Sequence, residues 1–454
     1  MVKASLKKVF IKNFKSLHDC EIDIGKMNVV VGANASGKSN LVEAFRLLKK
    51  IYADKDPFPF LEWWGYNNVV WQRKEELPII IGLIFDIEGY EVYFETTSTG
   101  ASGKFQIMRE ILEIRDYVRI EKEGGLLTIK HDGNFIDNLI KNLPMYEISH
   151  GGKKILQKEK EHLTYAKQIN TDFNQKLFEH KPELGEQIVL INEKETKKIL
   201  ILLSQIPSLI KSHQINEKGN SLPIICPIIY NINNDREGTI YEVALDAIIS
   251  TINNLIILNP LNIRSMKNPQ PFRREETPKE DGTNIASVYH TIYLKEGKIP
   301  DEIYNPLSMV FPKIDVRPHI TDDGRVMIKF FEDGFGLLPP NTSDGIYKIL
   351  TVLIAIYLKP PLLIIDEIEN SLHPETLELI LDTIKASDIQ AIITTHSPVV
   401  VDMTEPDDMV LVEKEQGESR FKRIKDPDKI RNFLKEKGIT FSTGWLYGEI
   451  SQIE

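Results

Sequence analysis

Cysteine is almost absent from this sequence. Its 454 residues include two, Cys20 and Cys226, which lie far apart and have no metal-ligand spacing around them. Two isolated thiols exclude a disulfide framework and a cysteine-based zinc site. The composition therefore favours a protein of a reducing compartment.

Long apolar runs are also missing. A helix needs about 20 apolar residues to cross a bilayer, and the longest apolar stretch, ILTVLIAIYL at residues 349–358, is about half of that. The first residues, MVKASLKKVFIKNF, are interrupted by lysines and contain no signal-peptide core. We expect a soluble, cytoplasmic protein that has no membrane partner.

An excess of positive charge is missing as well. The chain has 56 basic and 66 acidic residues, a formal net charge of -10, which argues against a surface coated in nucleic acid. A local basic patch stays possible at residues 420–437, RFKRIKDPDKIRNFLKEK, which could follow DNA phosphates or form an ordinary solvated face. Internal repeats and sustained heptads are absent from the sequence, so a long coiled coil is not expected.

The stretch GANASGKS at residues 32–39 is the first motif with clear chemistry. It follows the apolar run MNVVV and precedes NLVEAFRLLKK, which has helical apolar spacing. A strand, a glycine loop and a helix in this order predict a phosphate-binding loop rather than an ordinary turn. Lys38 would contact the β and γ phosphates, and the Ser39 hydroxyl would bind Mg²⁺. The predicted nucleotide contacts are Gly32, Asn34, Ser36, Gly37, Lys38, Ser39 and Asn40.

An acidic pair follows a second apolar run, in PLLIIDEIENSLHP at residues 361–374. The run LLII is typical of a strand buried in a parallel sheet, and ligands of such sheets bind at the carboxyl ends of the strands. Adjacent side chains of a strand point to opposite sides. We therefore expect Asp366 to support Mg²⁺ and Glu367 to orient and deprotonate the attacking water, whereas without a phosphate loop the pair would be solvated acids.

Two further stretches belong to the same pattern. AIITTHSP, residues 391–398, predicts another buried strand, and His396 at its end could contact the γ-phosphate instead of serving a structural role. In NTSDGIYKILTVLIAIYL, residues 341–358, Ser343 or Asp344 caps a helix that has Gly345 in its first turn. Taken alone this is a capped core helix, but its N-terminus could also bind an anion.

Together with FKSL at residues 14–17, these motifs resemble the ABC-type ATPase heads of the SMC/RecF class. The chain is most similar to short AAA-family ATP-binding proteins related to OLD-family ATPases. The resemblance implies ATP and Mg²⁺ as ligands, Ser343, Asp344 and Gly345 as signature residues, residues 369–373 as the D-loop and His396 as the switch histidine. It also implies a homodimer in which Ser343 of one head faces the γ-phosphate held by Lys38 of the other.

The sequence departs from the family pattern at two points. The signature is TSDG, where transporters have LSGG. The Q-loop glutamine, a magnesium ligand in this family, has no clear position, and Gln72 is the candidate, with an exposed polar residue as the alternative.

The expected fold is an α/β, P-loop NTPase head of the ABC type, with a mixed sheet, helices on both faces, an antiparallel β-subdomain and a helical insertion. Residues 1–135 and 285–454 would form the two parts of the head, and residues 136–284 the mainly helical insertion. Lysine- and glutamate-rich segments at 153–180 and 186–213 are expected to be amphipathic helices. Residues 262–283 are polar and contain proline, so we expect a surface loop there.

We expect an ATPase that acts in DNA repair or maintenance, or in anti-phage defence. The alternative is a nucleotide-dependent scaffold with negligible turnover that controls a partner effector such as a nuclease. A fused nuclease is disfavoured because few residues follow His396 for a further domain, and because the D-x-D of residues 426–428 contains a proline and has no buried strand before it.

Overall fold

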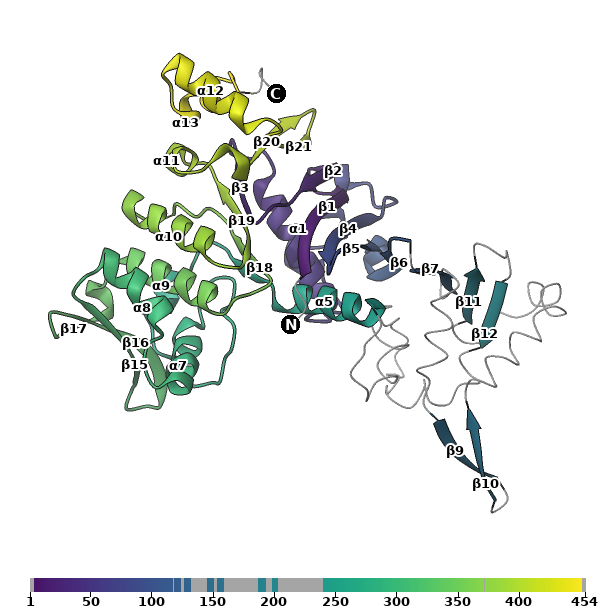
Figure 1. Cartoon of the computed structure of the whole chain (residues 1–454). Helices are drawn as coiled ribbons and strands as arrows, with labels where there is room; N and C mark the ends of the chain where they lie inside the picture. Colours follow the sequence, from purple (N-terminus) through teal and green to yellow (C-terminus); the bar gives the residue numbers. More distant parts are fainter. Residues whose placement is uncertain are drawn as a thin grey trace. The chain divides into compact units, whose positions relative to one another are not determined.

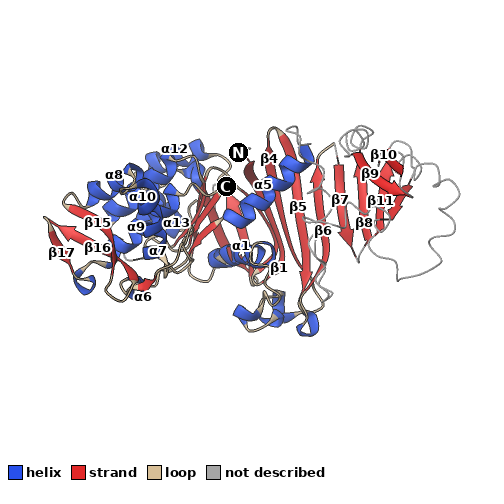
Figure 2. Ribbon diagram, turned by 90° about the horizontal axis from the view of Figure 1, so that it is seen from below, coloured by secondary structure: helices blue, strands red, loops and turns tan. Residues whose placement is uncertain are grey.

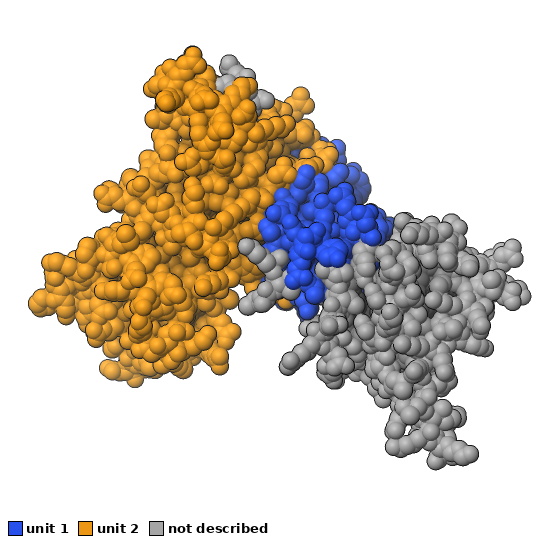
Figure 3. Space-filling view, in the orientation of Figure 1, with its two compact units in different colours: residues 1–15, 50–250 blue, residues 16–49, 251–454 orange. Residues whose placement is uncertain are grey.

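The computed structural model describes residues 4–116, 118–123, 126–131, 145–150, 153–158, 187–192, 198–202, 240–370 and 372–450. The chain forms two compact units, shown in Figure 3: unit 1 comprises residues 1–15 and 50–250, and unit 2 comprises residues 16–49 and 251–454. In the described ranges no helix is long and apolar enough to cross a membrane.

Unit 1 is built on a largely antiparallel sheet (Figure 2) with the strand order β12-β11-β8-β7-β6-β5-β4-β1. The antiparallel β-subdomain expected from the sequence is present, and it includes the hairpin of β4 and β5. The β4–β5 turn has positive φ at Glu88 and Gly89, as a two-residue hairpin turn requires. The strands are β1 (Ala4–Phe14), β4 (Ile79–Ile87), β5 (Tyr90–Thr99), β6 (Gln106–Ile114), β7 (Val118–Glu123), β8 (Leu126–His131), β11 (Gln187–Asn192) and β12 (Lys198–Leu202).

The expectation of helices over 153–180 and 186–213 is wrong wherever the structure describes these segments. Residues 153–158 form β10 (Lys153–Lys158), which pairs with β9 (Met145–His150), and 187–192 and 198–202 form β11 and β12. The runs QIVLIN and KILIL are rich in β-branched residues, which favour strands over helices. The division at 135/136 and 284/285 stays a prediction, because residues 132–144 and 203–239 lie outside the described ones. The last element before residue 255 is helix α5 (Ile240–Asn254).

Unit 2 contains a sheet with the strand order β13-β18-β19-β3-β20-β21. Neighbouring strands are parallel from β13 to β20, and β21 is antiparallel to β20. Strand β19 thus lies between the strand that leads into the phosphate loop and the strand that leads into the acidic pair. The strands are β13 (Ile256–Leu258), β18 (Leu362–Ile365), β19 (Gln390–Thr395), β3 (Met27–Gly32), β20 (Met409–Glu415) and β21 (Glu418–Arg423).

Both faces of this sheet are covered, since every residue of β3 and β18 is buried. Alternate residues of β3, Met27, Val29 and Val31, belong to one hydrophobic core with the buried residues of helices α9 (Asp344–Tyr357) and α10 (Pro374–Ala386). Continuous apolar runs such as MNVVV and LLII are what a parallel sheet buried on both faces requires. The core fixes the carboxyl ends of β3, β18 and β19, where the predicted site residues begin.

Helices α9 and α10 lie beside β18 and β19 in Figure 1. A smaller antiparallel sheet pairs β14, β15 and β17 with β16. Further elements of unit 2 are β2 (Leu17–Asp23), α1 (Lys38–Tyr52), α6 (Ile263–Met266), β14 (Gln270–Pro271), α7 (Ile285–Glu296), α8 (Asp301–Val310), β15 (Ile314–Ile320), β16 (Arg325–Glu332), β17 (Phe335–Leu337), α11 (Pro398–Asp402), α12 (Pro427–Lys437) and α13 (Phe441–Leu446).

Candidate functional site

The loop after β3 has the backbone that its glycines make possible. Gly37 has φ +109, which side chains other than glycine rarely allow, and a Cβ at this position would lie 2.0 Å from Ser419 Oγ. A Cβ at Gly32 would lie 2.5 Å from the carbonyl oxygen of Val412. Both positions therefore require glycine, and the strand–loop–helix arrangement expected around GANASGKS is present.

A cluster of hydroxyl groups is hydrogen-bonded to the loop. Ser419 Oγ donates to the carbonyl oxygen of Ser36 at 2.6 Å and lies 2.6 Å from Ser16 Oγ. Asn40 Nδ2 donates to Ser16 Oγ at 2.6 Å. Ser16 stands in the FKSL stretch, but no pattern in the sequence pointed to Ser419, which is brought here by the β2–β21 packing of unit 2.

Lys38 is folded back onto its own loop. Its Nζ donates to the carbonyl oxygens of Gly32 at 2.7 Å and Ala33 at 2.9 Å, and the side chain is buried. Burial lowers the pKa of Lys38 below its usual range, and the carboxylates of Glu369, Asp366 and Glu367 oppose this shift. The ammonium group thus lies in the field of the acidic residues after β18, and a phosphate bound in the loop would be a stronger partner for it than two carbonyls.

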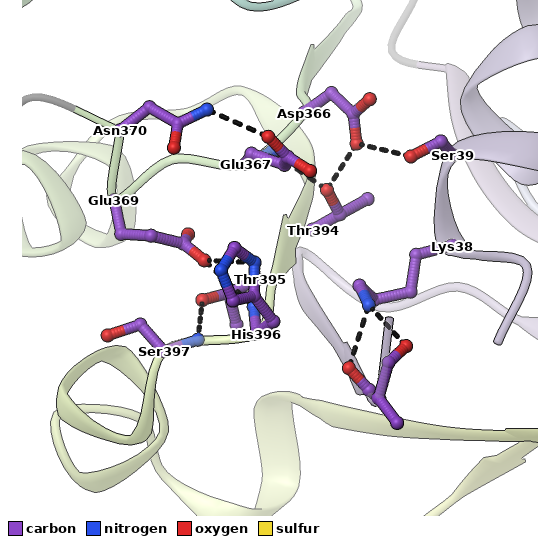
Figure 4. Close-up of polar contacts among 12 residues, drawn as sticks. Lys38, Ser39, Asp366, Glu367, Glu369, Asn370, Thr394, Thr395, His396 and Ser397 are labelled. Atoms are coloured by element: carbon purple, nitrogen blue, oxygen red, sulfur yellow. Dashed lines mark hydrogen bonds and ion pairs between the residues drawn. The ribbon is translucent and has the colours of Figure 1, made fainter. Parts of the chain in front are cut away.

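Ser39 lies next to Asp366, the first residue of the acidic pair, at the carboxyl edge of the sheet (Figure 4). Ser39 Oγ donates to Asp366 Oδ1 at 3.3 Å, and Thr394 Oγ1 donates to the same oxygen at 2.5 Å. Thr394 Oγ1 accepts from the Glu367 N–H at 2.9 Å, so one threonine of β19 contacts both acidic residues. Burial raises the pKa of Asp366 above its usual value, and the bonds from Thr394 and Ser39 oppose this.

Glu367 is held in an uncommon backbone conformation. Its φ is +51, in the left-handed region, which for a residue other than glycine costs on the order of 1–3 kcal/mol. Its carboxylate Oε2 accepts from Asn370 Nδ2 at 2.8 Å, and its carbonyl oxygen accepts from Lys348 Nζ at 3.2 Å. Asp366 and Glu367 both follow the end of β18, so the alternation expected along a strand does not apply to them, and their carboxylates have different hydrogen-bond partners.

His396 is oriented by the D-loop. Glu369 Oε1 lies 2.9 Å from His396 Nδ1 and also accepts from the His396 N–H at 2.9 Å. Within the described residues no hydrogen-bond partner contacts Nε2, and the side chain is 41% exposed, so Nε2 is available for a ligand. Glu369 Oε2 is buried without a hydrogen-bond partner in the same residues.

The signature residues lie at the start of helix α9. Ser343 is the N-cap residue, its side chain makes no capping bond, and both Ser343 and Asp344 are exposed. Lys267 Nζ lies 2.7 Å from Asp344 Oδ1 and donates to the Thr342 carbonyl oxygen at 2.7 Å. Among the described residues no hydrogen bond or ion pair joins residues 343–345 to residues 32–40.

Residues 262–283 are thus more than a surface loop. The segment contains α6 and β14, and Lys267 brings a cation to the signature motif. No pattern in the sequence indicated this contact, because Lys267 and Asp344 are far apart along the chain.

Several predicted ligands are not joined to this cluster. Gln72 lies in unit 1, in the 3-10 turn η3 (Trp71–Arg73), is exposed and has φ +51; its role as a metal ligand stays a prediction. Asn34 is exposed at the tip of the loop, and Ser36 Oγ is buried without a hydrogen-bond partner in the described part of the chain. In that part no group of three or more His, Cys, Asp or Glu side chains gathers as a metal site.

The basic segment at 420–437 uses its arginines within the fold. Arg423 donates to the Asn28 side chain at 2.6 Å and to the Asp407 carbonyl oxygen at 2.8 Å. Arg431 contacts Glu405, Asp407 and Asp428. The D-x-D of this segment is the start of a helix, where the Asp426 side chain caps α12, so it is not arranged as a nuclease carboxylate pair.

Comparison with known families agrees with this geometry. The family model described as "AAA domain" matches residues 8–222, and the one described as "AAA domain, putative AbiEii toxin, Type IV TA system" matches residues 210–402. Each match spans less than half of the chain, and together they include the phosphate loop and the acidic pair. Residues 8–402 thus match models of AAA domains. The structure itself has a parallel sheet with a strand, a glycine loop and a helix in the order of a P-loop NTPase, and a largely antiparallel sheet in unit 1.

Similarity to individual proteins is more distant. A curated relative, "Uncharacterized protein MJECL44" of Methanocaldococcus jannaschii, is 34% identical over 140 residues, 30% of this chain and 36% of the relative, so the match spans about a third of either. Among solved structures, an SmcHead bound to the C-winged helix domain of ScpA has 13% identity and a TM-score of 0.48, covering 92% of this chain and 97% of that one. An Smc head from Pyrococcus furiosus, bound to the C-terminal domain of ScpA, has 13% identity and a TM-score of 0.45, with 95% and 99% covered.

Proposed function

We propose that this AAA protein binds ATP and hydrolyses it to ADP and phosphate. The observation that carries the proposal is the continuous set of contacts from Ser39 through Asp366 and Thr394 to Glu367, next to Lys38. A phosphate-binding loop is thereby joined to a carboxylate that can act on water. The functions proposed for Gly32 to Asn40 in nucleotide binding follow from their place in this loop.

Magnesium is the metal that fits the donor set. The Ser39 hydroxyl and the Asp366 carboxylate are hard oxygen ligands, and Mg²⁺ in phosphate sites usually takes one or two protein oxygens and several waters. The absence of a larger acidic cluster in the described residues agrees with that. When bound with ATP, the ion would neutralise charge on the β and γ phosphates.

Glu367 is the proposed general base. In hydrolysis, a water oxygen forms a bond to the γ-phosphorus while the bond to the ADP oxygen breaks, and the water proton passes to the Glu367 carboxylate. Asn370 orients that carboxylate, and the Nε2 atom of His396 is proposed to contact the γ-phosphate. Lys38 is proposed to leave its loop carbonyls and to bind the phosphates.

We further propose that two heads enclose the nucleotide. Ser343 is exposed at the N-terminus of α9, where free N–H groups favour an anion. Asp344 next to it would repel a phosphate, and the Lys267 ammonium at 2.7 Å offsets that charge. Ser343 of one protomer would then contact the γ-phosphate held by Lys38 of its partner, so that ATP holds the dimer together and hydrolysis releases it.

The proposed setting is DNA maintenance or anti-phage defence in the cytoplasm. One matching family is described as a putative toxin of a type IV TA system, which favours defence. Arg423 and Arg431 of residues 420–437 contact other side chains of the fold, so this segment gives no support for DNA binding. The alternative is a scaffold with negligible turnover that controls a partner effector. Glu367 and His396 in oriented positions favour hydrolysis, because a pure scaffold needs no general base.

A turnover assay with the purified chain tests this function. Phosphate release from Mg²⁺–ATP, with and without DNA, should exceed that of the Lys38→Ala variant. Tight ATP binding with phosphate release no faster than that variant would favour the scaffold, and absence of ATP binding would overturn both.

A further inference from the structure

Lys348 is a buried lysine that neither the phosphate loop nor the signature motif includes. It lies in helix α9 and is 5% exposed. Its Nζ donates to the carbonyl oxygens of Asn370 at 2.7 Å and Glu367 at 3.2 Å. Among the described residues no carboxylate forms an ion pair with it.

These two bonds close the turn that carries the proposed base. The Asn370 N–H donates to the Glu367 carbonyl oxygen at 3.2 Å, and the Asn370 side chain donates to the Glu367 carboxylate. Lys348 therefore holds both ends of a short segment in which Glu367 has φ +51. A left-handed residue persists only where its surroundings enforce that conformation, and the surroundings here are Thr394, Asn370 and Lys348.

Burying an ammonium group without a carboxylate partner is unfavourable for stability. Desolvation lowers the pKa of Lys348 to about 8, and the nearby carboxylates of Glu369 and Glu367 oppose this. An apolar side chain of similar length would fill the same space without this cost. The lysine is thus placed for a contact that an apolar residue cannot make.

Helix α9 also gives Lys348 a second connection. Ser343 and Asp344 lie at its N-terminus, a little more than one turn before Lys348. A packed helix moves as a rigid element, so a shift of its N-terminus is passed to the segment that Lys348 holds.

We propose that Lys348 is a positioning residue that fixes the backbone of Glu367. The orientation of the Glu367 carboxylate then depends on the position of helix α9. The inference rests on the proposed ATPase function. If the signature residues of one head contact the nucleotide of the partner head, helix α9 shifts. Lys348 then passes this shift to Glu367 of its own head. Hydrolysis in one site then depends on occupancy of the other.

The test compares variants of the full chain in ATP affinity and in the rate of phosphate release at saturating ATP. Lys348→Met should reduce that rate about 30- to 100-fold, as expected for a misplaced catalytic group, with the ATP Kd changed less than about threefold. Lys348→Arg, which keeps a charged donor, should recover most of the rate. The matched control is Thr351→Val, which removes another buried polar group of α9, bonded only to the Tyr347 carbonyl oxygen, and should keep the wild-type rate.

The outcomes separate the two proposals. A wild-type rate in Lys348→Met, with Glu367→Gln inactive, would overturn the role of Lys348 and leave the ATPase intact. If Lys348→Arg releases phosphate no faster than Lys348→Met, the role of Lys348 would also be overturned. Absence of hydrolysis in the wild type would overturn both. If Lys348→Met does not fold, Lys348→Gln decides: a rate at least about tenfold lower at unchanged Kd supports the proposal, and the wild-type rate contradicts it.

Discussion

The Ser39 hydroxyl lies 3.3 Å from Asp366 Oδ1, although 327 positions separate the two residues in the chain. Ser39 lies in the first turn of helix α1, after β3, and Asp366 directly follows β18, two strands away in the same sheet. We propose that this hydroxyl and carboxylate, beside a lysine that folds over a glycine loop, bind a metal-bound phosphate.

Loss of the loop lysine should abolish nucleotide binding. Lys38→Ala removes the ammonium that would contact two phosphates, and charge-assisted bonds of this kind contribute about 1.5–3 kcal/mol each. We expect the ATP Kd to rise about 100-fold or more in titration calorimetry. Lys26→Ala is the control, because Lys26 is a surface lysine of unit 2 bonded to the Lys385 carbonyl oxygen. Unchanged affinity in Lys38→Ala would remove the phosphate-loop assignment.

An arginine at the signature serine should block association of the heads. Ser343→Arg places a bulky side chain where the partner's phosphate would lie, whereas the nucleotide of its own head is untouched. In light scattering with Mg²⁺–ATP, a hydrolysis-deficient protein carrying this change should stay monomeric, with its ATP Kd unchanged. Asn305→Arg, at an exposed position of α8, is the control. Dimers that survive Ser343→Arg would refute the enclosed nucleotide.

The ion pair at the signature predicts a rescue. Lys267→Ala leaves the Asp344 carboxylate without its neutralising partner, so ATP-dependent dimerisation should weaken by about tenfold. Asp344→Asn in the same chain removes the unpaired charge and should restore most of the association. If the double variant dimerises no better than Lys267→Ala, charge compensation is not the role of Lys267.

The buried lysine predicts a pH dependence of stability. The folded chain releases the Lys348 proton near pH 8, whereas the unfolded chain keeps it to about its ordinary value of 10.5. Between these values the unfolded state binds more protons, so the free energy of unfolding rises with pH. Relative to Lys348→Met, the wild type should gain about 2 kcal/mol between pH 8 and pH 10 in urea unfolding. A pH-independent difference between the two proteins would contradict this assignment.

The parts of the site that follow strands could be predicted from the sequence. Three of these parts come directly after an apolar run: GANASGKS, the acidic pair at 366–367 and the segment that ends in His396. An apolar run predicts a buried strand, and therefore also which residues lie at its carboxyl end. Lys348 and Lys267 could not be found in this way. The contacts of Lys348 depend on how α9 packs against residues 367–370, and those of Lys267 depend on where residues 262–283 approach the N-terminus of α9. Thr394 stood in a predicted strand, but its contact with both acidic residues is a matter of register between β18 and β19.

The fold of residues 153–202 was predicted less well. Lysine and glutamate dominate its composition and favour exposed helices, whereas the described residues are short β-branched strands that pair with neighbours, β11 with β8 and β12. Pairing of this kind depends on partners distant in sequence, which composition does not encode.

Lys38 and Glu367 are proposed to act on one bound triphosphate. This can be measured by following γ-labelled ATP on the Glu367→Gln variant. The control is Glu378→Gln, which changes an exposed glutamate of α10. The variant should keep the wild-type ATP Kd and hold intact ATP in a dimer, with hydrolysis about 100- to 10,000-fold slower than wild type. Release of labelled phosphate at the wild-type rate would show that the base lies elsewhere and would contradict the account.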